Sequence, residues 1–198
     1  GLSVTEDNFE LIFGINHFGH FLLTNRLLDL LKKSAPSRVV TVSSEAHNRA
    51  PRLNMTRADP EVAGFLYPHL KGYTYSKLAN VLFGRELARR EASSGLVSTS
   101  LHPGVIYTPI WKTSLTADGS PWLTAMYYAL SPLMWTFFID EEAGAQTILH
   151  CALDDSVSDL SGSYFDNCQV TEPSALAQDD EVARRLWEVS CQATGLKC

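Results

Sequence analysis

The stretch Val39-Val40-Thr41-Val42-Ser43 decides the fold class of this chain of 198 residues. It is short, rich in β-branched residues and bounded by polar residues on both sides. A run of this kind is typical of a strand that is buried on both faces, as strands are in a parallel sheet. Two further short runs, 96–101 and 163–165, are interpreted as strands of the same sheet.

Helical patterns separate these strands. The predicted helices cover residues 3–33, 72–92, 140–153 and 179–195, the first with a capping box at Ser3–Glu6. Helices that alternate with apolar strands indicate a parallel sheet with crossover helices. We therefore predict an α/β fold, and residues 1–198 show no linker that would divide them into two domains.

The first predicted helix carries an apolar stripe at helical spacing, which we expect to be buried. Its members are Phe9, Ile12, Phe13, Leu23, Leu27 and Leu30. Asn16 shares this stripe, and we expect it to be hydrogen-bonded because an unpartnered buried amide costs roughly 1–3 kcal/mol. Gly14 and Gly19 allow a local break in the helix that exposes backbone carbonyls.

The segment Tyr73-Thr74-Tyr75-Ser76-Lys77 lies in the helix predicted over 72–92. This helix is expected to turn its leucines inward and its charged residues outward, namely Leu78, Leu82 and Leu87 against Arg85, Glu86, Arg89, Arg90 and Glu91. A tyrosine four residues before a lysine places both side chains on one face of a helix, about a turn apart. The cation stabilises a phenolate relative to a phenol, so Tyr73 is a candidate acid/base for an alcohol or a carbonyl. Taken alone, the spacing is more often an ordinary pair on a helix surface.

Other polar residues are expected at the same edge of the sheet. Ser43 and Ser44 follow the first strand, and His102-Pro103-Gly104 follows the second. Ligands of open parallel sheets bind beyond the carboxyl ends of the strands, so these segments border one crevice. Either serine can cap the segment after its strand, and His102-Pro103-Gly104 fits a plain turn as well.

Charge and composition exclude some classes of protein. The formal net charge of −6 argues against a partner made of nucleic acid, which requires a basic face. The four cysteines show no metal-binding spacing, so no metal is expected and we interpret them as reduced or incidental. No secretory signal opens the chain, but its first residue is Gly1 rather than methionine, so a targeting segment or anchor would lie upstream of it. We expect an intracellular protein, in the cytoplasm or at the surface of the endoplasmic reticulum membrane.

An apolar segment stands apart from the rest of the chain. Residues 119–139 contain no charged side chain and are rich in aromatic residues, with Pro121 and Pro132 interrupting them. We interpret the region 105–139 as a lid over an apolar substrate. Contact with a membrane surface is the competing interpretation, and a membrane span is the least favoured one.

Together these motifs resemble the short-chain dehydrogenase/reductase family, in particular its retinol dehydrogenase branch and the related WW-domain-containing oxidoreductase. The residues that carry the resemblance stand in the family's order. They are Asn16-His17-Phe18-Gly19-His20-Phe21, Val42-Ser43-Ser44, Tyr73 to Asn80, His102-Pro103-Gly104, Gly162-Ser163-Tyr164-Phe165 and Ala183-Arg184-Arg185-Leu186-Trp187. The resemblance covers essentially the whole chain.

The resemblance implies a role for each matching residue. Tyr73 would be the catalytic acid/base, and Lys77 would stabilise its phenolate and hold the nicotinamide ribose of NADP or NAD. Ser44 would hydrogen-bond the substrate oxygen, and the backbone carbonyl of Asn16 would hold a water that relays protons to Lys77. The residues that would line the cofactor are Pro103, Gly104, Ile106 and Thr108.

The sequence lacks the two motifs that characterise the first half of the family's domain. The family's glycine-rich phosphate loop and its Asn-Asn-Ala-Gly motif are both absent from the sequence. The resemblance therefore implies the C-terminal part of a doubly wound, Rossmann-type parallel-sheet domain. Because the phosphate loop holds the cofactor in the family, a fragment without it would be inactive on its own.

These features predict an oxidoreductase that interconverts an alcohol and a carbonyl on a lipophilic substrate, such as a retinoid or a steroid. Two alternatives remain open: a binding or scaffold fragment of the same fold, and an epimerase-type enzyme for nucleotide sugars. A second copy of the chain, forming a homodimer, is a further possible partner.

Overall fold

The computed structural model describes residues 3–50, 68–106 and 138–197, with residues 121–122, 124–126 and 128–129 between them. Its sheet has the strand order β1-β2-β3-β4. The strands are β1 (Ser37–Val42), β2 (Leu96–His102), β3 (Tyr164–Asp166) and β4 (Gln169–Val170). The first three strands pair in parallel and β4 pairs antiparallel to β3, which confirms the predicted parallel sheet.

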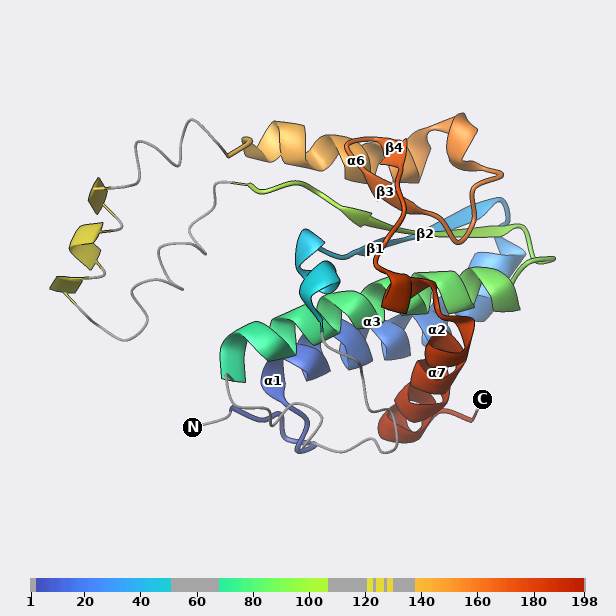
Figure 1. Cartoon of the computed structure of the whole chain (residues 1–198). Helices are drawn as coiled ribbons and strands as arrows, with labels where there is room; N and C mark the ends of the chain where they lie inside the picture. The colour runs from blue at the N-terminus through green and yellow to red at the C-terminus, as the bar shows by residue number, and fades with distance from the viewer. Residues whose placement is uncertain are drawn as a thin grey trace.

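Helices lie on both faces of this sheet (Figure 1). α6 (Glu141–Leu153) lies on one face, whereas α2 (His20–Lys33), α3 (Pro68–Arg90) and α7 (Asp180–Thr194) lie on the other. The shorter elements of the described part are α1 (Leu11–Phe13), the π-helix η1 (Gly14–Gly19) and the 3-10 helices η2 (Glu45–Arg49), η4 (Asp155–Val157) and η5 (Ala175–Gln178). The three layers make this an α/β fold.

The strand register sets the geometry of one edge of the sheet. Val42 pairs with Leu101, and His102 pairs with Asp166, so β1, β2 and β3 end at nearly the same level. The segments that follow β1 and β2 therefore leave the sheet side by side, as the sequence predicts.

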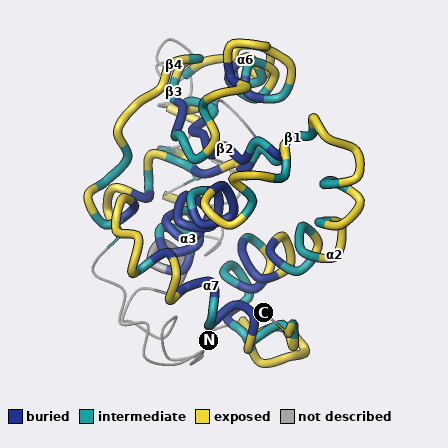
Figure 2. Tube along the Cα trace, turned by 90° about the vertical axis from the view of Figure 1, so that its right-hand side faces the viewer, coloured by how far each residue is buried: buried dark blue, intermediate teal, exposed yellow. Residues whose placement is uncertain are grey.

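Helix α3 supplies the centre of the core. Its residues Leu78, Leu82 and Leu87 are fully buried, as predicted, and each stabilises the fold by about 1.5–3 kcal/mol relative to an exposed side chain. Figure 2 shows this helix as the most continuously buried one. A rigid α3 matters for function because it carries Tyr73 and Lys77.

The start of the first helix was predicted wrongly. Residues 3–10 are not helical: Val4 forms an antiparallel bridge with Glu10, and the helix begins at Leu11. The capping residue is Glu10, whose carboxylate accepts hydrogen bonds from the backbone N–H groups of Ile12 and Phe13. A glutamate in this position performs the role that the sequence assigned to Ser3.

The apolar stripe of this helix was also extrapolated wrongly. Leu23, Leu27 and Leu30 are 56%, 42% and 61% exposed, whereas Phe21 is buried in the core. The cause is the π-helix at Gly14–Gly19, because its i→i+5 hydrogen bonds rotate the later residues about the helix axis. A stripe projected from Phe9 across this break consequently ends on the wrong face.

Several smaller expectations were also tested. Glu86, expected at the surface, is 1% exposed and pairs with Arg89 and Arg90. Cys151 is free as expected, but Cys191 is disulfide-bonded, so the interpretation of all cysteines as reduced is wrong.

Most of the region 105–139 lies outside the described residues, so its role as a lid stays a prediction, as does the single domain over 1–198. Trp122 and Tyr128, which the structure does describe, are 74% and 56% exposed. Among the described helices, none combines the length and the apolar character that crossing a membrane requires.

Candidate active site

Lys77 is anchored at the end of β1. Its Nζ donates a hydrogen bond to the backbone carbonyl of Val42, the last residue of the strand, over 3.1 Å. The side-chain amide of Asn80, one turn later on α3, donates to the same carbonyl over 3.2 Å. Burial lowers the pKa of the Lys77 ammonium from its usual value. The amine is therefore held at the edge of the sheet in a partly desolvated setting.

The structure confirms that Tyr73 and Lys77 share one face of α3. The Lys77 Nζ lies 5.5 Å from the centroid of the Tyr73 ring, within the range of a cation–π contact. Tyr75 differs, because it is 7% exposed and burial raises the pKa of its phenol. Of these two phenols, only that of Tyr73 is paired with the lysine.

The two serines after β1 have different surroundings. Ser43 is buried, its hydroxyl donates to the carbonyl of Lys77 over 2.6 Å, and its N–H donates to Leu101. Ser44 is half-buried and caps η2, where its Oγ accepts a hydrogen bond from the Ala46 N–H over 3.2 Å. Because Oγ serves as an acceptor there, the Ser44 hydroxyl proton can be donated to a substrate oxygen. These contacts favour Ser44 over Ser43 as the substrate-binding serine.

Asn16 is linked to the turn that carries Tyr73. Its side-chain amide donates to the Ser76 hydroxyl over 3.1 Å, and Ser76 donates in turn to the Tyr73 carbonyl over 2.8 Å. The Asn16 carbonyl lies in the π-helix, 3.0 Å from Nδ1 of His20. The predicted hydrogen bonding of Asn16 is thus confirmed. The water that the resemblance places on its carbonyl stays a prediction, and His20 occupies one of the positions around that oxygen.

The segment after β2 packs against the start of α6. Gly104 has a φ of +89°, and a Cβ there would lie 2.4 Å from Cδ1 of Ile139. Ile106 forms a parallel bridge with Ile139, and its Cδ1 would lie 2.3 Å from a Cβ on Gly144. The two glycines therefore let the chain after Pro103 lie close to α6. Thr108, also predicted to line the cofactor, lies outside the described residues.

Two residues near this edge had no role assigned from the sequence. Asn80 shares the Val42 carbonyl with Lys77, and His47 hydrogen-bonds the carbonyl of Ser44. Asn80 stands one turn after Lys77, so helical spacing alone could have placed it on the same face. His47 lies three residues after Ser44, but only the 3-10 turn brings its ring back to that carbonyl.

The arrangement suits a ligand with two neighbouring hydroxyl groups. An ammonium has three donors, and among the described residues the Lys77 Nζ uses one of them, on Val42. The remaining two can reach adjacent hydroxyl oxygens, as a ribose presents. This donor set fits a nicotinamide nucleotide. Among the described residues, no group of histidine, cysteine and acidic side chains could hold a metal ion.

Curated proteins similar to this chain match it over nearly its whole length. It is 45% identical over 192 residues to dehydrogenase/reductase SDR family member 13 of Bos taurus, covering 97% of this chain and 48% of that protein. It is 44% identical over 195 residues to retinol dehydrogenase 11 of Homo sapiens, covering 98% and 57% respectively. This chain belongs to the short-chain dehydrogenase/reductase family. It spans about half the length of these curated relatives.

Solved structures share the fold of this chain. An uncharacterized protein from Mycobacterium paratuberculosis superimposes with a TM-score of 0.68 at 32% identity, covering 100% of this chain and 63% of that one. The NADPH-bound carbonyl reductase from chicken fatty liver shares the fold, with a TM-score of 0.54 at 18% identity, over 85% and 60% of the two chains. A scan against protein-family models found no match.

Proposed function

We propose that this chain forms the catalytic part of an NAD(P)-dependent oxidoreductase that interconverts an alcohol and a carbonyl. The observation that carries the proposal is the position of Lys77. Its ammonium is fixed on the carbonyl of Val42, the last residue of β1, and lies over the ring of Tyr73. Ser44 follows Val42 by two residues along the chain. The similarity to short-chain dehydrogenase/reductases over nearly the whole chain supports the same activity.

The residues would divide the work as follows. In the direction of reduction, the Ser44 hydroxyl donates a hydrogen bond to the substrate carbonyl oxygen and orients it. The Tyr73 phenol gives its proton to that oxygen, and the Lys77 ammonium stabilises the phenolate that remains. The bound cofactor supplies the hydride that reaches the substrate carbon. In the reverse direction the phenolate of Tyr73 takes the alcohol proton.

Asn16 and the segment after β2 would have supporting roles. The chain of hydrogen bonds from Asn16 through Ser76 fixes the backbone at Tyr73, so the phenol starts from a defined position. Pro103, Gly104 and Ile106 pack near the start of α6, where the segment would border the nicotinamide. Fixed positions of this kind supply much of the rate enhancement in enzymes.

A lipophilic substrate, such as a retinoid or a steroid, is the class that we propose. The uncharged segment 119–139 supports it, and one relative in the comparison is named a retinol dehydrogenase. Action inside the cell, contact with a membrane surface and formation of a homodimer belong to the same proposal. Each of them stays a prediction.

The test is turnover by the full-length protein with NADPH or NADH. We expect either NADPH or NADH to be oxidised in the presence of retinal or a steroid ketone. The same cofactor should be oxidised more slowly with a short polar aldehyde. Ser44→Ala should lower kcat while leaving cofactor affinity unchanged, because the Ser44 hydroxyl would bond the substrate oxygen and the Ala46 N–H, not the cofactor. A full-length protein that binds the cofactor but reduces no carbonyl compound would refute the proposal.

A scaffold role, in which the same fold binds a partner without turnover, is the second candidate. Titration of the full-length protein with NADPH separates the two candidates. Saturable binding below millimolar concentration supports the enzyme, and its loss in Lys77→Met assigns that binding to the proposed site. Absence of binding up to millimolar concentration favours the scaffold.

A further inference from the structure

His47 makes two hydrogen bonds that define its protonation state. It is 1% exposed, its Nδ1 lies 2.7 Å from the carbonyl oxygen of Ser44, and its Nε2 lies 3.2 Å from the backbone nitrogen of Ser174. A carbonyl oxygen only accepts and a backbone N–H only donates. The two neighbours therefore require the neutral tautomer with its proton on Nδ1.

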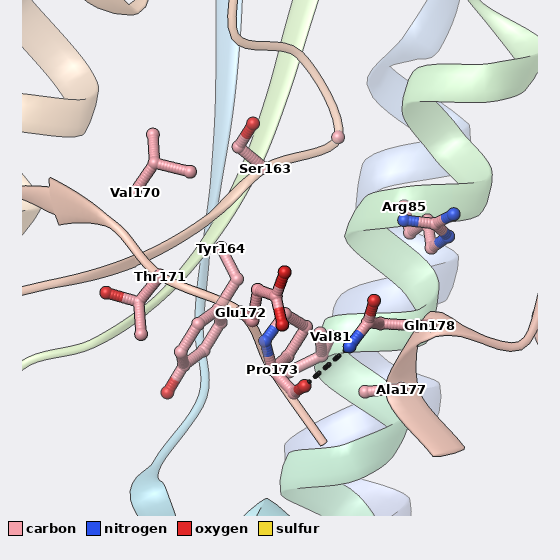
Figure 3. A pocket seen from close by; sticks show the side chains of 11 residues that line it. Val81, Arg85, Ser163, Tyr164, Val170, Thr171, Glu172, Pro173, Ala177 and Gln178 are labelled. Atoms are coloured by element: carbon pink, nitrogen blue, oxygen red, sulfur yellow. Dashed lines mark hydrogen bonds between the residues drawn. The ribbon is translucent and has the colours of Figure 1, made fainter. Parts of the chain in front are cut away.

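The segment around Ser174, whose N–H donates to His47, is itself held by hydrogen bonds. Gln178 donates its side-chain amide to the carbonyl of Pro173 over 2.9 Å, as Figure 3 shows, and the N–H of Ala177 donates to the carbonyl of Ser174 over 2.9 Å. The imidazole ring also lies 5.0 Å, between centroids, from the buried ring of Tyr164 on β3. His47 is thus held by a rigid segment and can hold Ser44 in turn.

We propose that His47 is the positioning residue of the active site: its Nδ1–H holds the Ser44 carbonyl and thereby sets the direction of the Ser44 hydroxyl. The inference rests on the proposed role of Ser44 in binding the substrate oxygen. The same imidazole fastens the η2 turn to the segment before η5 through Ser174. Side-chain direction at a catalytic group is sensitive to such support, since a misplacement of about 1 Å can cost roughly a hundredfold in rate.

The hydrogen bond between His47 and Ser174 is expected to break at low pH. Burial lowers the pKa of His47 from its usual value of 6.5. The groups that act on it are Glu45 on its own turn, which raises the pKa, and His102 at the end of β2, which lowers it. Protonation of Nε2 would direct an N–H at the N–H of Ser174, so the hydrogen bond to Ser174 is lost as the pH falls through this pKa.

Two variants of His47 separate positioning from general stability. His47→Phe keeps a ring against Tyr164 and the backbone bond from the residue 47 N–H to the Ser44 carbonyl, but removes both hydrogen bonds of the imidazole. We expect kcat to fall roughly 10- to 100-fold with unchanged cofactor affinity. His47→Asn keeps an N–H near the place of Nδ1, so we expect a smaller loss of kcat and no loss of activity linked to His47 protonation. Asn48→Ala, on the same turn and exposed, is the matched control and should keep the wild-type kcat.

The rates are measured in the full-length protein and divided by the folded fraction from circular dichroism. If His47 acts through Ser44, His47→Phe adds little to the loss of kcat in a Ser44→Ala background. Two outcomes would overturn the inference: a wild-type kcat in His47→Phe, or a loss that multiplies independently with that of Ser44→Ala.

A second measurement does not depend on turnover. The ring-nitrogen shifts of ¹⁵N-histidine-labelled protein should place the His47 proton on Nδ1, and a proton on Nε2 would overturn the inference while leaving the proposed function intact. The full-length protein could instead show the expected His47 tautomer and yet reduce no substrate. That result would refute the proposed function, and with it the catalytic consequence of the hydrogen bonds of His47.

Discussion

Replacement of Lys77 by methionine should separate cofactor binding from folding. The substitution keeps an unbranched apolar side chain as far as Cε and removes the ammonium that bonds the Val42 carbonyl. A buried carbonyl left without a donor would cost about 1–3 kcal/mol, but Asn80 continues to donate to this one. Removal of a partly desolvated charge also relieves a cost, because burial lowers the pKa of this lysine. We therefore expect the free energy of unfolding to change by less than about 1 kcal/mol.

Cofactor affinity should respond much more strongly. Hydrogen bonds to a charged group contribute about 1.5–3 kcal/mol, so the loss of the ammonium should weaken cofactor binding by a factor of about 10 to 150. The assays are urea unfolding for stability and titration of protein fluorescence with NADPH for affinity, both in the full-length protein.

The matched control is Lys32→Met, which removes one charge from a surface pair with Glu91. This control should alter stability by at most about 1 kcal/mol and leave cofactor binding unchanged. Unchanged affinity in Lys77→Met would refute the reasoning. A loss of stability above about 3 kcal/mol would also refute it, since the lysine would then be chiefly structural.

Three further predictions concern the acid/base, a buried histidine and the loop after β2. Tyr73→Phe should lower kcat by at least about 100-fold, whereas Tyr75→Phe, which alters a phenol away from the lysine, should keep most of the activity in steady-state assays. Burial lowers the pKa of His17 to about 4 from 6.5, so its contribution to stability is present above pH 6.5 and lost as the pH falls through 4. That loss is about 3 kcal/mol, and urea unfolding between pH 7 and 4 should show a shallower fall in His17→Gln. Gly144→Val should destabilise the protein by about 1–3 kcal/mol, because its Cβ would lie 2.3 Å from Ile106, and an unchanged melting temperature would contradict this contact.

The sequence predicted the sheet well because its signals there are local. The β-branched run up to Val42 lies in β1, and Leu78, Leu82 and Leu87, expected to point inward from α3, are all buried. The pairing of Tyr73 with Lys77 followed from helical spacing alone, since both residues lie on one uninterrupted helix.

The wrong predictions from the sequence arose where a helix changes its geometry or where a residue's position depends on contacts that the sequence pattern does not show. The buried stripe of the first helix was misassigned because a π-helix over Gly14–Gly19 changes the phase, and sequence periodicity assumes a constant one. The buried position of Glu86 depends on its two arginine partners, which made all three residues look like a solvated face. The bridge through His47 joins residues 127 positions apart, so no local pattern could indicate it.

The most direct test of the account is a structure of the full-length protein with NADPH and a lipophilic carbonyl compound or an unreactive analogue. The account predicts one substrate oxygen within hydrogen-bond distance, about 2.6–3.2 Å, of both the Tyr73 phenol and the Ser44 hydroxyl. The ribose hydroxyls should then lie within the same range of the Lys77 Nζ. A substrate oxygen that contacts neither Tyr73 nor Ser44 would contradict it.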